Sequence, residues 1–261
     1  TTTSSTITFT VNGANDAPTA SNNTVTTNED TTYTFTASDF GFSDVDGDTL
    51  SSVTVSALSG SDGTFLLNGV AITGSTSVTK TQIDSGLLTF VPDSNENGSS
   101  YNTFTFTVND GTTDSASSYT MTVNVTAVND APTASNNTVT TNEDTDHTFA
   151  ASEFGFTDVD GDSLDHVSIE TLPSNGTLLL SGSAVSAGDQ ISAANISNLV
   201  FRPAANANGA SYDTFTFTVN DGTTDSASSY TMTVNVTAVN DAPTVVNDTD
   251  SVTEGGTVIE T

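Results

Sequence analysis

The stretch from Thr103 to Thr133, TFTFTVNDGTTDSASSYTMTVNVTAVNDAPT, occurs again without a single change from Thr214 to Thr244. Within it, Phe104–Val108 and Tyr119–Val125 alternate apolar residues with Thr or Asn. Because successive side chains of a β-strand point to opposite faces, this alternation predicts two half-buried strands, and the Asp110-Gly111 pair after the first predicts a turn. The stretch therefore predicts a β fold, and its recurrence predicts a tandem array.

The last part of this stretch, Asn129-Asp130-Ala131-Pro132, marks the boundaries of the array. It returns as Asn240-Asp241-Ala242-Pro243 and stands near the start as Asn15-Asp16-Ala17-Pro18. These three copies delimit two complete repeats, at residues 15–128 and 129–239, each of about 110 residues. Each copy is a candidate joint between neighbouring domains.

Two partial units flank the complete repeats. Residues 1–14 contain Ile7–Asn12, which aligns with Met121–Thr126 at the end of the first repeat. We expect this segment to be the last strand of a preceding repeat or, alternatively, a strand donated to another molecule. Residues 240–261 are expected to begin a third repeat.

Each complete repeat is predicted to be an antiparallel β-sandwich of immunoglobulin-like type. Signals for helix are almost absent, while strand patterns separated by Asn-Gly and Asp-Gly turns recur along the repeat. About seven short strands in about 110 residues is the density expected of such a sandwich. In the first repeat the clearest predicted strands are Tyr33–Ala37, Val53–Ser56, Thr64–Leu67, Leu87–Val91, Phe104–Val108 and Tyr119–Val125.

The charge of the chain narrows its possible partners. The 261 residues include 32 acids and two Lys or Arg residues, for a formal charge of −30, with no Cys. So negative a chain repels nucleic acid and anionic membranes, and its own repulsion favours a bound cation. No apolar run is long enough to span a membrane, so we expect no membrane insertion.

Acidic groups recur at the same turn positions in both repeats. The densest is Asp44-Val45-Asp46-Gly47-Asp48, repeated as Asp158-Val159-Asp160-Gly161-Asp162. Calcium takes six to eight oxygen ligands, and Asp at alternate positions of a Gly-containing loop can turn several carboxylates toward one centre. Asp, Asn and Gly are also ordinary turn formers, which is a sufficient explanation for a single Asp-Gly pair. Grouped like charges favour the calcium interpretation for the longer loop.

The order of these groups resembles a cadherin-type domain of the kind found in long arrays in giant secreted bacterial surface adhesins of the RTX type. Glu29, then Asp44 and Asp46, then the linker Asn129-Asp130-Ala131-Pro132 follow the family's order, and Phe104–Pro132 follows its closing pattern. The resemblance covers both repeats. It implies calcium ions at the joints between successive domains, in an extracellular protein.

Carried over by this resemblance, three joints would each take oxygen ligands. The first joint would use Asn15, Asp16, Asp44, Asp46 and Asp110; the central joint Glu29, Asn129, Asp130, Asp158, Asp160 and Asp221; and the last joint Glu143, Asn240 and Asp241. Asp48 and Asp162 are additions to the family pattern that could complete a site.

The sequence also departs from the family. The linker has Ala127 and Ala131 where cadherins carry Asp and Asn, and the acidic triplet in mid-domain is present only as Asp93–Asn97 in the first repeat. The number of ions per joint therefore stays open.

The leading hypothesis is a calcium-stiffened extender segment of a bacterial surface adhesin or extracellular fibre, whose partners are neighbouring repeats of the same chain. One alternative is a subunit of a self-assembling fibre, a homopolymer in which residues 1–14 add to a sheet of another copy. Another is a carbohydrate-binding module, for which Tyr101 and Tyr212 are the best exposed aromatic candidates.

An enzyme is not expected. Acid–base catalysis needs carboxylates in different environments within a cleft, whereas here they recur at equivalent turns of both repeats. There is no Cys nucleophile, and Lys80 and Arg202 are the only Lys and Arg residues.

Overall fold

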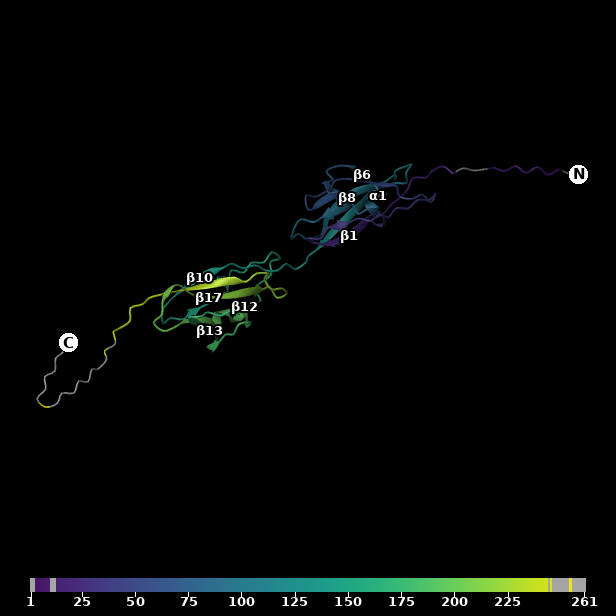
Figure 1. Cartoon of the computed structure of the whole chain (residues 1–261). Helices are drawn as coiled ribbons and strands as arrows, with labels where there is room; N and C mark the ends of the chain where they lie inside the picture. Colours follow the sequence, from purple (N-terminus) through teal and green to yellow (C-terminus); the bar gives the residue numbers. More distant parts are fainter. Residues whose placement is uncertain (1–2, 10–12, 244, 246–253, 255–261) are drawn as a thin grey trace. The chain divides into compact units, whose positions relative to one another are not determined.

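A computed structural model describes residues 3–9, 13–243, 245 and 254 of the chain. It divides into two compact units, Thr1–Asn129 and Asp130–Thr261, which correspond to the two predicted repeats (Figure 1). Each unit is a pair of packed β-sheets with a hydrophobic core of its own. No helix in the described part of the chain is both long and apolar enough to cross a membrane.

Unit 1 has one five-stranded and one four-stranded sheet. The first has the order β1-β9-β8-β3-β6, with β1 (Asn23–Asn28), β9 (Tyr119–Thr126), β8 (Gly98–Asn109), β3 (Ser52–Val55) and β6 (Thr76–Thr79). The second has the order β2-β7-β4-β5, with β2 (Tyr33–Thr34), β7 (Leu88–Val91), β4 (Thr64–Leu67) and β5 (Val70–Ala71).

Unit 2 repeats this plan. Its five-stranded sheet runs β10-β18-β17-β12-β15, with β10 (Asn137–Asn142), β18 (Tyr230–Thr237), β17 (Gly209–Asn220), β12 (His166–Thr171) and β15 (Gln190–Ser192). Its four-stranded sheet runs β11-β16-β13-β14, with β11 (His147–Thr148), β16 (Leu199–Pro203), β13 (Gly176–Leu180) and β14 (Ser183–Ala184).

The predicted immunoglobulin-like β-sandwich is confirmed, with one departure from antiparallel pairing. Strand β1 runs parallel to β9, from Asn23 opposite Met121 to Asn28 opposite Thr126, and β10 pairs with β18 in the same way. Parallel neighbours need a long connection, and here almost the whole repeat lies between the two strands. Each repeat is therefore closed by pairing its first strand with its last.

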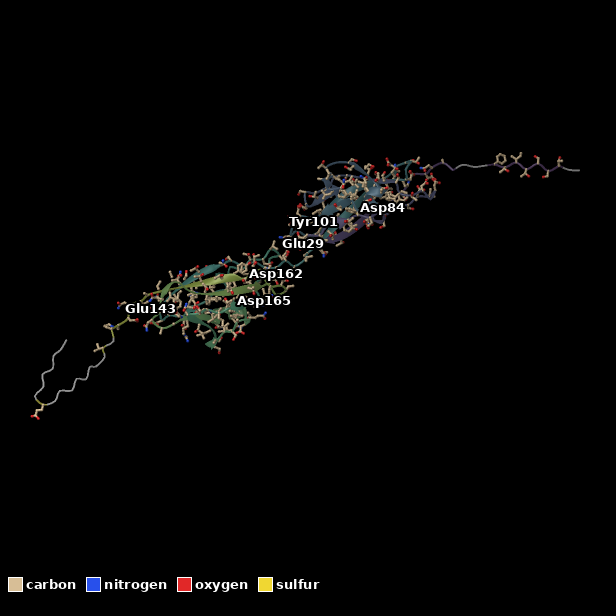
Figure 2. The ribbon with its side chains drawn as sticks, in the orientation of Figure 1. Glu29, Asp84, Tyr101, Glu143, Asp162 and Asp165 are labelled. Carbon is tan, nitrogen blue, oxygen red and sulfur yellow. The ribbon has the colours of Figure 1, made fainter. Side chains whose placement is uncertain are left out.

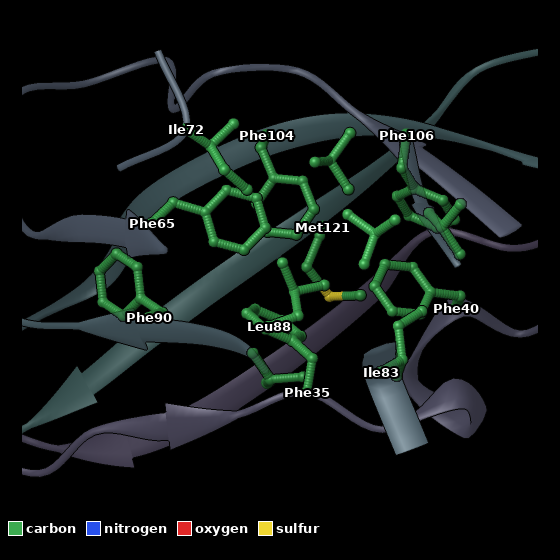
Figure 3. Close-up of a cluster of buried hydrophobic side chains, with 14 of the residues drawn as sticks. Phe35, Phe40, Phe65, Ile72, Ile83, Leu88, Phe90, Phe104, Phe106 and Met121 are labelled. Carbon is green, nitrogen blue, oxygen red and sulfur yellow. The ribbon is translucent and has the colours of Figure 1, made fainter. Parts of the chain in front are cut away.

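The core of unit 1 is built largely from Phe side chains that alternate along the strands. Phe65 and Phe104 stack with ring centroids 4.4 Å apart, while Phe40 meets the edge of Phe106 at 5.1 Å (Figure 3). Met121 is fully buried in the same cluster. Aromatic pairs of this kind contribute beyond the burial of their surface, and they allow a short, Thr-rich repeat to form a dense core.

The short helices were not predicted from the sequence. Helix α1 (Lys80–Asp84) begins after Thr79, whose hydroxyl accepts a hydrogen bond from the Gln82 backbone N–H, while Gln82 caps Thr79 in return. The 3-10 helices η1 (Ala37–Phe40), η2 (Ala151–Phe154) and η3 (Ala193–Asn198) have four, four and six residues. A single turn leaves no periodic pattern in the sequence, and only the Thr-x-x-Gln capping box could have indicated α1.

The predicted flanking units are only partly described. Residues 3–9 adopt no regular secondary structure, and the rest of the expected Ile7–Asn12 strand, residues 10–12, lies outside the described residues. Most of the expected third repeat, 240–261, also lies outside them.

Close packing leaves no room for a side chain at Gly176 in unit 2. A Cβ added to Gly176 would overlap the Phe201 ring and lie 2.9 Å from the Arg202 carbonyl oxygen. We predict that Gly176→Ala lowers the free energy of unfolding of unit 2 by about 1–3 kcal/mol, because an overpacked core must shift its backbone. Urea unfolding of the full chain measures this. Gly209→Ala is the control, since nothing lies within 4 Å of its added Cβ, and we expect a change below about 0.5 kcal/mol. Equal effects of the two substitutions would contradict this explanation.

Candidate metal centre

The acidic loop of each unit is folded by its own first aspartate. In unit 1 the Asp44 Oδ1 atom accepts hydrogen bonds from the backbone N–H groups of Asp46 at 2.8 Å and Asp48 at 3.2 Å. Asp158 holds Asp160 and Asp162 in the same way, at 2.9 and 3.0 Å. Asp side chains commonly bond backbone two residues onward, so the spacing itself makes the turn. As a result, carboxylate oxygens of all three aspartates lie within 4.8 Å of one another in each unit.

One oxygen in each loop has no partner. The Oδ2 atoms of Asp44 and Asp158 are buried and accept no hydrogen bond. A buried acceptor without a partner is costly, and a carboxylate oxygen more so. Since each of these aspartates also has a carboxylate oxygen within 4.8 Å of oxygens of two further aspartates, the residues present fit a hard cation such as calcium.

The opening segment of each repeat folds onto its acidic loop. In unit 1 the Asp16 backbone N–H donates to Asp46 Oδ2 at 2.6 Å, and the Asn15 side-chain amide donates to Asp110 Oδ2 at 3.0 Å. In unit 2 the Asp130 backbone N–H donates to Asp160 Oδ2 at 2.7 Å. The carboxylates therefore accept hydrogen bonds from the linker as well as from the backbone of their own loops.

Asp110 lies in a turn that it stabilises itself. Its Oδ1 atom accepts the backbone N–H groups of Thr112 at 2.6 Å and Thr113 at 2.7 Å. The hydrogen bond from Asn15, together with these backbone donors, lowers the pKa of Asp110 below its ordinary value of 3.8. Asp221 accepts the same two backbone donors, from Thr223 and Thr224, in unit 2.

Each unit also has a buried glutamate that lies outside its acidic loop. Glu29 is 2% exposed, and its Oε1 atom accepts the backbone N–H of Val128 at 2.6 Å, just before the linker. Glu143, 6% exposed, accepts the backbone N–H of Val239 at the same distance. Both glutamates were predicted as site residues, and each holds the chain where it leaves its repeat.

The sequence did not identify the partners of these glutamates. The Asn97 side-chain amide donates to Glu29 Oε2 at 3.4 Å, and Asn208 donates to Glu143 Oε2 at 2.8 Å. Both asparagines precede a glycine, and the sequence indicated only a turn at Asn97-Gly98, at the end of the acidic stretch Asp93–Asn97. Their equivalent position in the two repeats was the only sequence signal for this role.

The acidic loop and the buried glutamate lie at opposite ends of each unit. Glu29 follows Asn28, which pairs with Thr126 at the end of β9, whereas the acidic loop leads into Ser52, which pairs with Asn109 at the end of β8. Because β8 and β9 are antiparallel, these pairs mark opposite ends of the sheet. Figure 2 shows the same separation between Glu143 and Asp162 within unit 2.

The structure thus brings together most of the predicted residues in two within-unit groups. One group is Asn15, Asp16, Asp44, Asp46, Asp48 and Asp110; the other is Asp130, Asp158, Asp160 and Asp162, with Asp221 in the turn after β17. Glu29 and Glu143 are not in these groups, because they lie at the far end of their own units. Asn129 is the last residue of unit 1, and Asn240 donates to the Asp241 backbone carbonyl at 3.1 Å.

The tyrosines considered for stacking on a ligand are partly buried. The Tyr101 ring packs edge-on against Phe90, with its hydroxyl donating to Glu96 at 3.0 Å. Burial is the main reason that the Tyr101 pKa is raised to about 12. Tyr212 packs likewise on Phe201 and donates to the Asn175 carbonyl at 2.8 Å. Both therefore serve as packed amphipathic residues in the structure.

Comparison with protein families gives one match. The family described as "Bacterial Ig domain" matches residues 15–126 and again residues 129–237. These ranges agree closely with the repeats predicted from the linker copies. A comparison with curated proteins gave no match.

Solved structures with a similar chain path have low sequence identity. They include Drosophila N-cadherin EC1-4, at 17% identity and a TM-score of 0.42, covering 87% of this chain and 50% of that one. An endo-fucoidan hydrolase from glycoside hydrolase family 107 gives 19% identity and a TM-score of 0.29, covering 89% of this chain and 30% of the hydrolase. The chain therefore spans about a third of that enzyme's length and half of the cadherin fragment.

We predict that removing the Asn15 amide shifts the titration of Asp110. The folded-state pKa is depressed, so the contribution of this hydrogen bond is present above pH 3.8 and is lost as the pH falls through the depressed value. Asn15→Ala should raise the Asp110 pKa toward 3.8, as followed by carboxyl carbon NMR. Asn97→Ala, at the far end of the unit, is the control. An Asp110 titration that Asn15→Ala leaves unmoved would show that the linker contact is absent in solution.

Proposed function

The chain belongs to the bacterial Ig domain family, and we propose that it is a calcium-stiffened spacer segment of an extracellular surface protein, such as an adhesin or fibre. The observation that carries the proposal is the unpartnered, buried Oδ2 of Asp44, together with its counterpart on Asp158, each in an aspartate that clusters with two more carboxylates. Tandem Ig-like domains of this family are typically structural and non-enzymatic modules at the cell surface, which suits a spacer.

The scarcity of basic residues supports the need for a cation. Lys80 pairs with Asp84 at 2.5 Å and Arg202 with Asp146 at 2.7 Å, so both are paired with carboxylates outside the acidic loops. The only two Lys and Arg residues in the sequence therefore leave the loops without compensation. A divalent ion would supply the positive charge that the protein lacks.

The contacts of the linker suggest how an ion would act on the spacer. Asp46 and Asp160 each hold a backbone N–H of the linker, and they also belong to the acidic loops. Bound calcium would reduce the repulsion within each loop and so favour the conformation that holds the linker. Extracellular modules bind calcium with Kd values of about 10⁻⁴–10⁻³ M, so the spacer would be stiffer outside the cell than where calcium is scarce.

We predict that calcium raises the stability of both repeats and that EDTA reverses the gain. At a calcium concentration tenfold above Kd, one site adds about 1.4 kcal/mol, or a rise in Tm of roughly 5–10 °C for a domain of this size. Calorimetric melting of the full chain with calcium and with EDTA measures this.

The variant Asp158→Asn locates the effect. Its amide keeps an oxygen for the two backbone donors but replaces the unpartnered oxygen by a donor, so repeat 2 should lose its calcium response while repeat 1 keeps it. Glu170→Gln removes one exposed charge elsewhere in repeat 2 and should preserve the response. If magnesium, or no ion at all, reproduces the calcium curve, the proposal is wrong.

Strand donation is the second candidate function, and one observation favours it. Ile7 is 73% exposed and Phe9 is 85% exposed, although both occupy the register of residues that are fully buried in β9, Met121 and Val123. An unpaired segment with this pattern can add to the sheet of another molecule.

Deleting residues 1–14 tests strand donation. If the segment joins molecules, light scattering should show concentration-dependent oligomers of the full chain that the deletion abolishes. Ile7→Ser/Phe9→Ser keeps the length of the chain and should act like the deletion. Oligomers that persist without the segment, or a full chain that stays monomeric at all concentrations, would exclude it.

A further inference from the structure

The C-terminal hairpins of the two repeats are nearly interchangeable. Hairpins β8–β9 and β17–β18 have the same sequence from Thr103 and Thr214 onward. Their parallel partners β1 and β10 both read NTVTTN and pair in the same register. Strand pairing alone therefore does not tell one hairpin from the other.

The hairpins also share an aromatic contact, although Phe65, on which Phe104 stacks, is replaced by Leu178 in repeat 2. Phe104 packs on Phe35 with ring centroids 5.6 Å apart, and Phe215 packs on Phe149 at the same distance. A chain with two such repeats risks docking a hairpin on the wrong sandwich, within one molecule or between two copies.

One buried position differs between the hairpins. In repeat 1 it is Asn102, 3% exposed, which uses both sides of its amide. Its Nδ2 donates to the Asp62 carbonyl oxygen at 2.6 Å, while its Oδ1 accepts the Gly60 N–H at 3.1 Å. The neighbouring loop thus presents one acceptor and one donor to this side chain.

In repeat 2 the equivalent residue is Asp213, 5% exposed, and its loop presents donors. The backbone N–H groups of Asn175 and Gly176 donate to Oδ2 at 2.6 and 2.8 Å, and that of Ser174 donates to Oδ1 at 2.9 Å. These three N–H groups form a pocket for a carboxylate, where an amide nitrogen would be a fourth donor.

An exchange of hairpins would break both arrangements. Docked on repeat 1, Asp213 would turn a carboxylate oxygen toward the Asp62 carbonyl, which needs a donor. Docked on repeat 2, Asn102 would turn its NH₂ group toward backbone N–H groups, which need acceptors. Each mismatch leaves buried polar groups without partners, and that lowers the relevant folding equilibrium constant about 10- to 100-fold.

We propose that Asn102 and Asp213 are specificity determinants that direct each hairpin to its own sandwich and oppose strand exchange between repeats and between copies of the chain. The donor and acceptor pattern of each loop selects its residue. This role is independent of calcium, because it concerns the pairing of strands within each sandwich.

A cysteine cross-link can report exchange, since the chain has no Cys of its own. Thr24 on β1 pairs with Thr122 on β9, so Thr24→Cys/Thr122→Cys reports native pairing. Thr233 holds the place of Thr122 in repeat 2, where it pairs with Thr138, so Thr24→Cys/Thr233→Cys reports a repeat-2 hairpin docked on repeat 1. The full chain is refolded from urea, oxidised and resolved by size, which separates exchange within a chain from exchange between copies.

We expect the exchange cross-link to be rare in the parent chain and to rise at least severalfold in Asp213→Asn, which makes the two hairpins equivalent at this position. The double variant Asn102→Asp/Asp213→Asn mismatches both native pairings and matches both exchanged ones, so its exchange cross-link should exceed the parent's by about tenfold or more. Asn102→Asp also makes the two hairpins equivalent at this position, so the same exchange cross-link can be measured in it if Asp213→Asn folds poorly.

Two results would overturn the proposal. One is an exchange cross-link that stays at the parent's level in Asn102→Asp and in the double variant, even if both repeats melt earlier, because that is the signature of a purely local role. The other is a parent chain that already exchanges as much as its variants.

Discussion

Carboxylates crowded against their own linker are the constraint on which the rest of this structure depends. Asp44 and Asp158 fold their loops by accepting backbone N–H groups, and the same hydrogen bonds force like charges together. A chain with a formal charge of −30 has almost no basic side chains to offset this repulsion. The loop geometry is therefore favourable for the backbone and unfavourable for the charges, and the cation that we propose would relieve this repulsion.

The sandwich serves to hold these loops at one end and a buried glutamate at the other. Pairing the first strand of each repeat with its last places Glu29 beside the exit of the chain, and it places the acidic loop beside the entry. The central linker thus leaves repeat 1 through a hydrogen bond to Glu29 and enters repeat 2 through a hydrogen bond to Asp160.

Local sequence patterns predicted the strands of the sandwich and the turns of the acidic loops. The alternation of Phe104, Phe106 and Val108 sets a strand face by itself, and the spacing of Asp44, Asp46 and Asp48 sets a turn by itself. The hydrogen bond between Asn97 and Glu29 was beyond prediction, because it joins residues from distant loops that only the fold brings together. The parallel pairing of β1 with β9 was missed for the same reason. Asn102 and Asp213 look like an ordinary polar difference until their buried loops are seen.

The most direct test of the central claim is a calorimetric titration of the full chain with calcium. The account predicts saturable binding with a Kd of about 10⁻⁴–10⁻³ M and at least one calcium ion per repeat. In Asp158→Asn, repeat 2 should no longer bind its calcium, so the number of ions bound per chain should fall accordingly. A parent chain that releases or absorbs no binding heat up to several millimolar calcium, and whose amide NMR spectrum is unchanged, would contradict it.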